Sequence, residues 1–149
     1  MPVERNPFGF CAHSMTRMNV FGSSGVRGVV GETLTPSFVV EIAQSAAAEF
    51  TADRAAVARD TRLTGPMFAD SVAAGLTSVG LDVDCLGIVP TPGLQAYCER
   101  EGVPGVMVTA SHNPPEYNGI KLIGPDGVEL SRDRLDAVEA NLDDPPRLV

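Results

Sequence analysis

The chain has 149 residues, which is enough for one domain with a hydrophobic core, and 44% of its residues are hydrophobic. Its formal net charge is −8, which makes nucleic acids and anionic membranes poor partners. The sequence contains no apolar run of bilayer length and no apolar segment of the secretory type near its start. We therefore expect a cytoplasmic protein that binds neither nucleic acid nor membrane.

The cysteines support the same expectation. Cys11, Cys85 and Cys98 are odd in number, and their spacing fits neither a disulfide framework nor a metal site. We expect reduced thiols, with Cys85 buried in a strand.

The two ends of the sequence differ from its middle. Residues 1–17 show no clean period, because Pro2, Asn6, Pro7 and Gly9 interrupt it, which predicts a poorly ordered N-terminal extension. Residues 18–149 are expected to form the folded domain. Two consecutive prolines near the C-terminus, Pro145 and Pro146, are typical of an interdomain linker.

Between these ends, helical and strand patterns alternate. The clearest helix covers 35–50, where Thr35 can serve as the N-cap, Pro36 occupies the first helical position and apolar residues recur at helical spacing. Three further helices are expected, over 66–79, over 92–101 with Thr91 as N-cap, and after Ser131. Strands are expected over 55–58, 81–89, 106–108 and 119–123, and Asn118-Gly119 is expected to form a turn.

This alternation predicts the fold class. Strands that alternate with helices form a mostly parallel sheet covered on both faces, which is a three-layer αβα sandwich. The return from Ser111 to Lys121 is too short for a crossover helix, so the strand over 119–123 is expected to run antiparallel and to make the sheet mixed.

The segment after the strand at 106–108 carries the most chemistry. Ser111, His112 and Asn113 are consecutive, and two prolines follow them. Open α/β sheets bind ligands at the carboxyl ends of their strands, so these groups are candidates for a site. On local chemistry alone, an ordinary connecting loop remains the simpler interpretation.

A second candidate is the glycine-rich stretch at 21–31, which contains Arg27. Its glycines allow tight turns, and the planar Arg27 guanidinium can bind phosphate oxygens. The spacing is neither the dinucleotide fingerprint nor a Walker loop, and alone it is explained by a loop that leads into a strand.

Three segments together resemble one family. T-A-S-H-N-P followed by N-G-I-K resembles the active-site loop of the α-D-phosphohexomutases, and F-G-S-S-G-V-R-G resembles their opening motif. A-R-D-T-R-L-T-G resembles their G-R-D-T-R-x-S-G segment, with Ala58 in place of the first glycine. That segment is expected to buttress the site, and an Asp–Arg network that fixes a turn is preferred to direct substrate contact. The resemblance implies the family's first domain and an intramolecular phosphotransferase of the phosphoglucomutase or phosphomannomutase type.

The resemblance also implies roles for individual residues. Ser111 would carry the phosphoryl group between the 1- and 6-positions of a sugar phosphate through a bisphosphate. Lys121 would assist proton transfer or balance charge, and Arg27 would hold the transferring group. His112 and Asn113 would shape the loop and offer donors to phosphate, and His112 is a weaker candidate for the general base. Magnesium would bind Ser111 through its phosphate, with its other ligands outside this chain.

The resemblance covers the chain from Val20 onward but only about the first third of the family's length. The Asp-Gly-Asp-Gly-Asp type of metal loop is absent from the sequence. We therefore expect a phosphosugar and the remaining mutase domains as partners, and an isolated chain that is inactive as a mutase. Two alternatives stay open, namely a stand-alone phosphosugar- or phosphate-binding module without catalysis and an unrelated serine enzyme.

Overall fold

The computed structural model describes residues 19–23, 25–144 and 146. The predicted N-terminal extension at 1–17, with Cys11, lies outside these residues. The elements in chain order are β1 (Val26–Val29), α1 (Pro36–Phe50), β2 (Arg54–Arg59), α2 (Gly65–Ser78), β3 (Asp82–Ile88), α3 (Thr91–Glu101), β4 (Gly105–Val108), β5 (Tyr117–Ile123) and α4 (Arg132–Asn141).

The strands form one mixed sheet in the order β1-β5-β4-β2-β3. Strand β2 pairs in parallel with β3 and β4, whereas β5 pairs antiparallel with both β4 and β1. Strand β5 therefore runs against the other four. This arrangement confirms the prediction of a mostly parallel sheet with one antiparallel strand.

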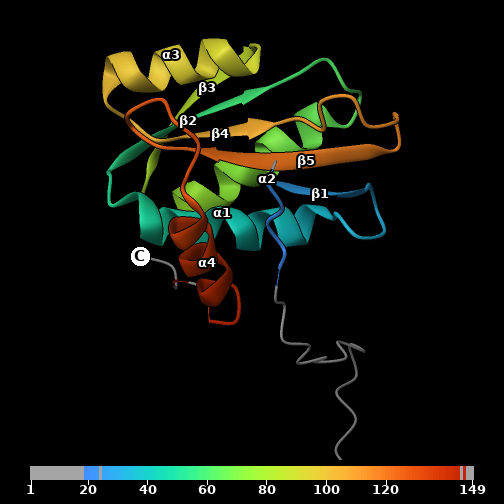
Figure 1. The fold of residues 1–149 in the computed structure, drawn as a ribbon, viewed down its shortest axis with the longest axis horizontal. Helices are drawn as coiled ribbons and strands as arrows, with labels where there is room; N and C mark the ends of the chain where they lie inside the picture. The colour runs from blue at the N-terminus through green and yellow to red at the C-terminus, as the bar shows by residue number, and fades with distance from the viewer. Residues whose placement is uncertain (1–18, 24, 145, 147–149) are drawn as a thin grey trace, which may run out of the picture.

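Helices cover the two faces of the sheet unequally (Figure 1). Helices α1 and α2 lie against one face, α4 packs on α1, and the larger hydrophobic cluster lies between these helices and the sheet. Among the helices that the structure describes, α3 is the one on the opposite face, where it packs on β2 and β4 over a smaller cluster. The three-layer prediction is confirmed, and Ile123 at the end of β5 is buried in the same smaller cluster as Leu94 and Cys98 of α3. None of the described helices is long and apolar enough to cross a membrane.

Capping explains where the helices begin, with one correction. Thr35 caps α1 as predicted, because its Oγ1 accepts a hydrogen bond from the Phe38 amide at 3.3 Å. Helix α3 starts one residue earlier than predicted, so Thr91 lies inside the helix and Pro90 is the N-cap. The Pro90 carbonyl accepts the first helical hydrogen bonds, and its extended backbone leaves Thr91 no capping role.

The prediction that Cys85 is buried was wrong, because its side chain is exposed whereas Cys98 is buried. Strand β3 is an edge strand that pairs only with β2, so the apolar pattern of its sequence does not bring it into the core. The pairing of β2 with β3 also shifts register after Cys85, which leaves Leu86 as an extra residue beside Gly87.

The predicted Asn118-Gly119 turn was also wrong, because both residues lie inside β5. A Cβ on Gly119 would lie 2.5 Å from the Val26 carbonyl oxygen and 2.7 Å from the Thr109 carbonyl oxygen. The absence of a side chain at Gly119 therefore allows β5 to lie this close to the backbone of β1 and to the end of β4. Asn118 is fully buried and donates to Thr64 Oγ1 at 2.9 Å.

Candidate active site

The candidate site is the loop between β4 and β5, which leaves the carboxyl end of a fully buried strand. Its central residue, Ser111, is exposed and has a φ of 53°. This left-handed conformation costs a residue with a side chain about 1–2 kcal/mol, so other interactions must hold it.

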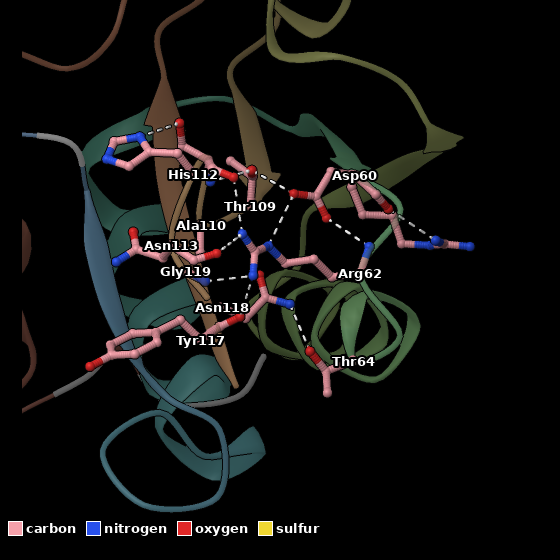
Figure 2. A network of polar contacts seen from close by, with 12 residues as sticks. Asp60, Arg62, Thr64, Thr109, Ala110, His112, Asn113, Tyr117, Asn118 and Gly119 are labelled. Carbon is pink, nitrogen blue, oxygen red and sulfur yellow. Dashed lines mark hydrogen bonds and ion pairs between the residues drawn. The ribbon is translucent and has the colours of Figure 1, made fainter. Parts of the chain in front are cut away.

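The amide of Ser111 is fixed by Thr109, the first residue after β4. Figure 2 shows Thr109 beside Asp60. Thr109 Oγ1 accepts a hydrogen bond from the Ser111 N–H at 3.0 Å and donates one to Asp60 Oδ2 at 2.7 Å. Asp60 follows β2, which is the parallel neighbour of β4. The hydrogen bond between Thr109 and Asp60 thereby links the carboxyl ends of the parallel strands β4 and β2 next to Ser111.

The carbonyl side of the loop is held by Arg62 (Figure 2). Its Nη2 donates to the carbonyl oxygens of Ser111 at 3.0 Å and Asn113 at 2.8 Å. Its Nη1 donates to those of Pro114 at 2.9 Å and Tyr117 at 3.0 Å. One guanidinium therefore binds three backbone carbonyls of the loop and a fourth at the first residue of β5.

Arg27 approaches the same loop from β1. Its Nη1 donates to the Ala110 carbonyl oxygen at 2.8 Å and to Asn113 Oδ1. Its Nε is buried without a partner, and its Nη2 has no hydrogen-bond partner among the described residues. The Nη2 of Arg27 is therefore the donor at the serine loop that suits an anion, whereas its Nε is enclosed, as is the Nε of Arg62.

His112 lies directly beside the serine, as the sequence requires. Its Nδ1 is 3.3 Å from Ser111 Oγ, which is a long contact for a hydroxyl hydrogen bond. Within the described residues, no third group orients the ring. The pair therefore lacks the base-and-orienter arrangement that activates a hydrolytic serine.

Lys121 shares the α3 face of the sheet with Arg27 but contacts a different group. Arg27 pairs with Gly119 across β1 and β5, and Lys121 follows Gly119 by two residues on the same face. The Lys121 Nζ lies 2.8 Å from Glu129 Oε1. The structure therefore brings Arg27, His112 and Asn113 to the Ser111 loop, whereas the Lys121 ammonium is paired with Glu129.

The described residues do not fit a metal ion by themselves. No three His, Cys, Asp or Glu side chains in this part of the chain gather closely enough to hold one. Ser111 would supply a single ligand through a phosphate, so a magnesium ion would need its other ligands from outside the described residues.

Two features of the site were not predicted from the sequence. The expected Asp–Arg network exists, since Arg62 Nε lies 3.5 Å from Asp60 Oδ2. The hydrogen bonds from Arg62 to the carbonyl oxygens of the serine loop were not predicted. Glu139 of α4 accepts hydrogen bonds from the amides of Phe21 at 2.7 Å and Asn19 at 3.1 Å, which ties down the start of the glycine-rich segment. No sequence motif points to that contact.

Fold and site together define an α/β domain that presents a serine loop at the carboxyl edge of a mixed sheet. Residues 18–146 match the family model described as phosphoglucomutase/phosphomannomutase, alpha/beta/alpha domain I. The chain belongs to this family.

Relatives and solved structures agree with the family match. The chain is 42% identical to a phosphoglucosamine mutase of Levilactobacillus brevis over 86% of its length, and 42% identical to a phosphoglucomutase/phosphomannomutase of Thermococcus kodakarensis over 80%. A phosphoglucomutase/phosphomannomutase family protein from Burkholderia thailandensis superposes with a TM-score of 0.73 at 32% identity and covers 85% of the chain. The chain spans 30%, 28% and 30% of these three proteins, respectively.

Proposed function

We propose that this chain is the phosphoryl-carrying domain of a phosphohexomutase, with the Ser111 hydroxyl as the carrier. The observation that carries the proposal is the geometry of Ser111, which is exposed in a left-handed conformation at the carboxyl edge of the sheet, next to Arg27. The mutase names of its relatives support the class of reaction.

The proposed reaction has two half-steps that balance. The oxygen of a free sugar hydroxyl bonds to the phosphorus on Ser111 while the bond from that phosphorus to the Ser111 oxygen breaks. The sugar hydroxyl gives up one proton and the Ser111 oxygen takes one up. In the second half-step the Ser111 oxygen loses its proton and bonds to the phosphorus of the other phosphate, while the bond from that phosphorus to the sugar oxygen breaks and the sugar oxygen takes up a proton. The net result is that phosphate has moved between the 1- and 6-positions.

The neighbouring residues support this chemistry by charge and position. The unused Nη2 donor of Arg27 can bind the oxygens of the transferring group. Asn113 orients Arg27 through its side-chain oxygen, and His112 can exchange a proton with Ser111. Lys121 would join them by leaving Glu129 when a phosphate enters.

Magnesium is proposed as the metal ion that would neutralise charge on the phosphoserine. The described residues supply too few ligands for it, so its other ligands would come from outside them. The same shortage underlies our expectation that the isolated chain does not turn over sugar phosphates.

A second candidate function is a phosphate-binding or phosphosugar-binding module without catalysis. The long contact of 3.3 Å between His112 Nδ1 and Ser111 Oγ, with no third group to orient the ring among the described residues, favours this alternative. The third possibility from the sequence, an unrelated serine enzyme, is set aside by the family match.

The test measures interconversion of hexose 1- and 6-phosphates by the protein as its source organism makes it, and by the 149-residue chain alone. We expect turnover in the former, its loss in Ser111→Ala, and none by the chain alone. Turnover that survives Ser111→Ala would contradict the carrier role. Binding of hexose phosphate without any turnover would favour the binding module.

A further inference from the structure

We propose that Arg62 is a positioning residue for phosphoryl transfer, whose guanidinium holds Ser111 in the left-handed conformation that presents its hydroxyl. The inference rests on the function proposed above, because it assigns Arg62 a part in the same reaction. In this role Arg62 acts on the backbone of the loop, because its Nη1 and Nη2 each donate to two backbone carbonyl oxygens.

The two peptide groups that flank the Ser111 α-carbon are both anchored. The N–H of Ser111 donates to Thr109 Oγ1, and the C=O of Ser111 accepts from Arg62 Nη2. These bonds constrain the dihedral angles on either side of the residue. A serine with a φ of 53° is disfavoured without such support, yet glycine cannot replace it because the proposed reaction needs the hydroxyl.

The terminal nitrogens of Arg62 are already used by protein groups. Nη1 and Nη2 each donate to two carbonyl oxygens, and the side chain is only 14% exposed. Arg27 differs, because its Nη2 has no hydrogen-bond partner among the described residues. The two arginines therefore have different roles in this proposal. Arg27 binds the transferring phosphoryl group, and Arg62 holds the backbone of the serine loop.

Arg62 is itself held in place by the loop between β2 and α2. Its backbone amide donates to Asp60 Oδ1 at 3.0 Å, and its carbonyl accepts from the Gly65 amide at 2.9 Å at the start of α2. Asp60 also accepts from Thr109, so one carboxylate orients both groups that anchor Ser111. The conformation of the serine is thereby tied to two parallel strands.

Arginine suits this role better than lysine. A planar guanidinium offers five N–H donors in a fixed fork, whereas an ammonium offers three donors around one nitrogen. A lysine at this position can replace some of the four carbonyl contacts but cannot reproduce their spread along the loop.

The experiment compares wild type, Arg62→Ala, Arg62→Lys and Thr109→Val in the protein as its source organism makes it. Arg54→Ala is the matched control, because it removes an equal charge from the opposite end of β2, where Arg54 pairs with Asp84. The readouts are the φ of Ser111 from crystal structures, kcat and KM for hexose-phosphate interconversion, the melting temperature, and rescue of kcat by added guanidinium ion.

We expect Arg62→Ala to move the Ser111 φ out of the left-handed region and to lower kcat on the order of 100-fold, because a small misplacement of a reacting group has an effect of that size. KM should be unchanged, since in this role Arg62 acts on the backbone of the loop. Guanidinium ion should restore part of kcat in Arg62→Ala only. Arg62→Lys and Thr109→Val should fall between Arg62→Ala and wild type, and Arg54→Ala should match wild type.

Two results would overturn the inference. One is a folded Arg62→Ala protein that keeps the Ser111 conformation and its kcat. The other is a loss of kcat that follows the melting temperature and resists guanidinium, which would make the role one of general stability. If wild type has no turnover, the proposed function fails, and the φ of Ser111 in Arg62→Ala still decides whether Arg62 holds the loop.

Discussion

The Lys121 ammonium and the Glu129 carboxylate lie 2.8 Å apart in a pair that is exposed on the Glu129 side. Glu129 comes from the short segment that bridges back to Ile123 after the turn at 124–127. The residue proposed to balance charge at the phosphate therefore has a competing partner on its own face of the sheet. Binding of an anion next to Arg27 would have to draw Lys121 away from Glu129.

Replacing Glu129 should release that lysine. We expect Glu129→Gln to bind a hexose phosphate up to about fivefold more tightly, since an exposed ion pair contributes roughly 1 kcal/mol or less. Titration by calorimetry measures the affinity. Glu49→Gln on α1, which covers the opposite face of the sheet, removes an equal charge, and an equal gain in this control would show that only net charge matters.

Gly119 provides a second prediction, about the packing behind the site. In Gly119→Ala the new Cβ would press on the carbonyl oxygens of Val26 and Thr109 and on Arg27 Cγ. We expect a loss of about 1–3 kcal/mol in the free energy of unfolding, because those backbones cannot move apart without breaking the sheet. Urea denaturation measures it. Gly22→Ala, whose Cβ meets only an ordinary contact at 3.7 Å, should have little effect. Equal stability of the two variants would contradict the packing argument.

The cysteines provide a third prediction. Burial raises the pKa of the Cys98 thiol to about 11, whereas Cys85 is exposed at the sheet edge. Iodoacetamide should therefore modify Cys85 in the native protein and reach Cys98 only after unfolding, because the thiolate is the reactive form. Peptide mapping separates the sites. Rapid labelling of Cys98 in the native protein would contradict this prediction, because it would show that reagent reaches the smaller cluster beneath α3.

The raised pKa of Cys98 also fixes the direction of a pH effect. The unfolded thiol ionises near its ordinary value of 9.0, whereas the folded thiol stays neutral until about 11. The contribution of Cys98 to stability is thus complete below pH 9.0 and is lost as the pH rises towards 11. Between pH 9.0 and 11, the free energy of unfolding should fall less in Cys98→Ala than in wild type, and urea denaturation at several pH values measures this.

Element order and strand direction were predictable because they depend on local patterns. Thr35 and Pro36 mark the start of α1, and the short path from Ser111 to Lys121 forces β5 to run antiparallel. The errors came from tertiary context. Cys85 has the pattern of a buried strand residue, but only the strand order reveals that β3 is an edge.

Site residues that belong to one contiguous motif could be predicted from the sequence. Contacts between residues far apart in the sequence could not. Ser111, His112 and Asn113 are adjacent in the sequence, and the family motif identifies Arg27. Arg62 reaches the loop from 49 residues away in the sequence, and its targets are backbone carbonyls, which carry no side-chain signature. The partner of Lys121 was equally hidden, because Glu129 belongs to a turn that follows the motif.

The central claim is that Ser111 is a phosphoryl carrier, and the state of this residue in the source organism tests it most directly. Protein isolated from that organism with phosphatase inhibitors would be digested, and the peptide that contains Ser111 analysed by mass spectrometry. We predict one phosphoryl group on Ser111, and none at this position in Ser111→Ala. A Ser111 peptide that carries no phosphate would contradict the assignment.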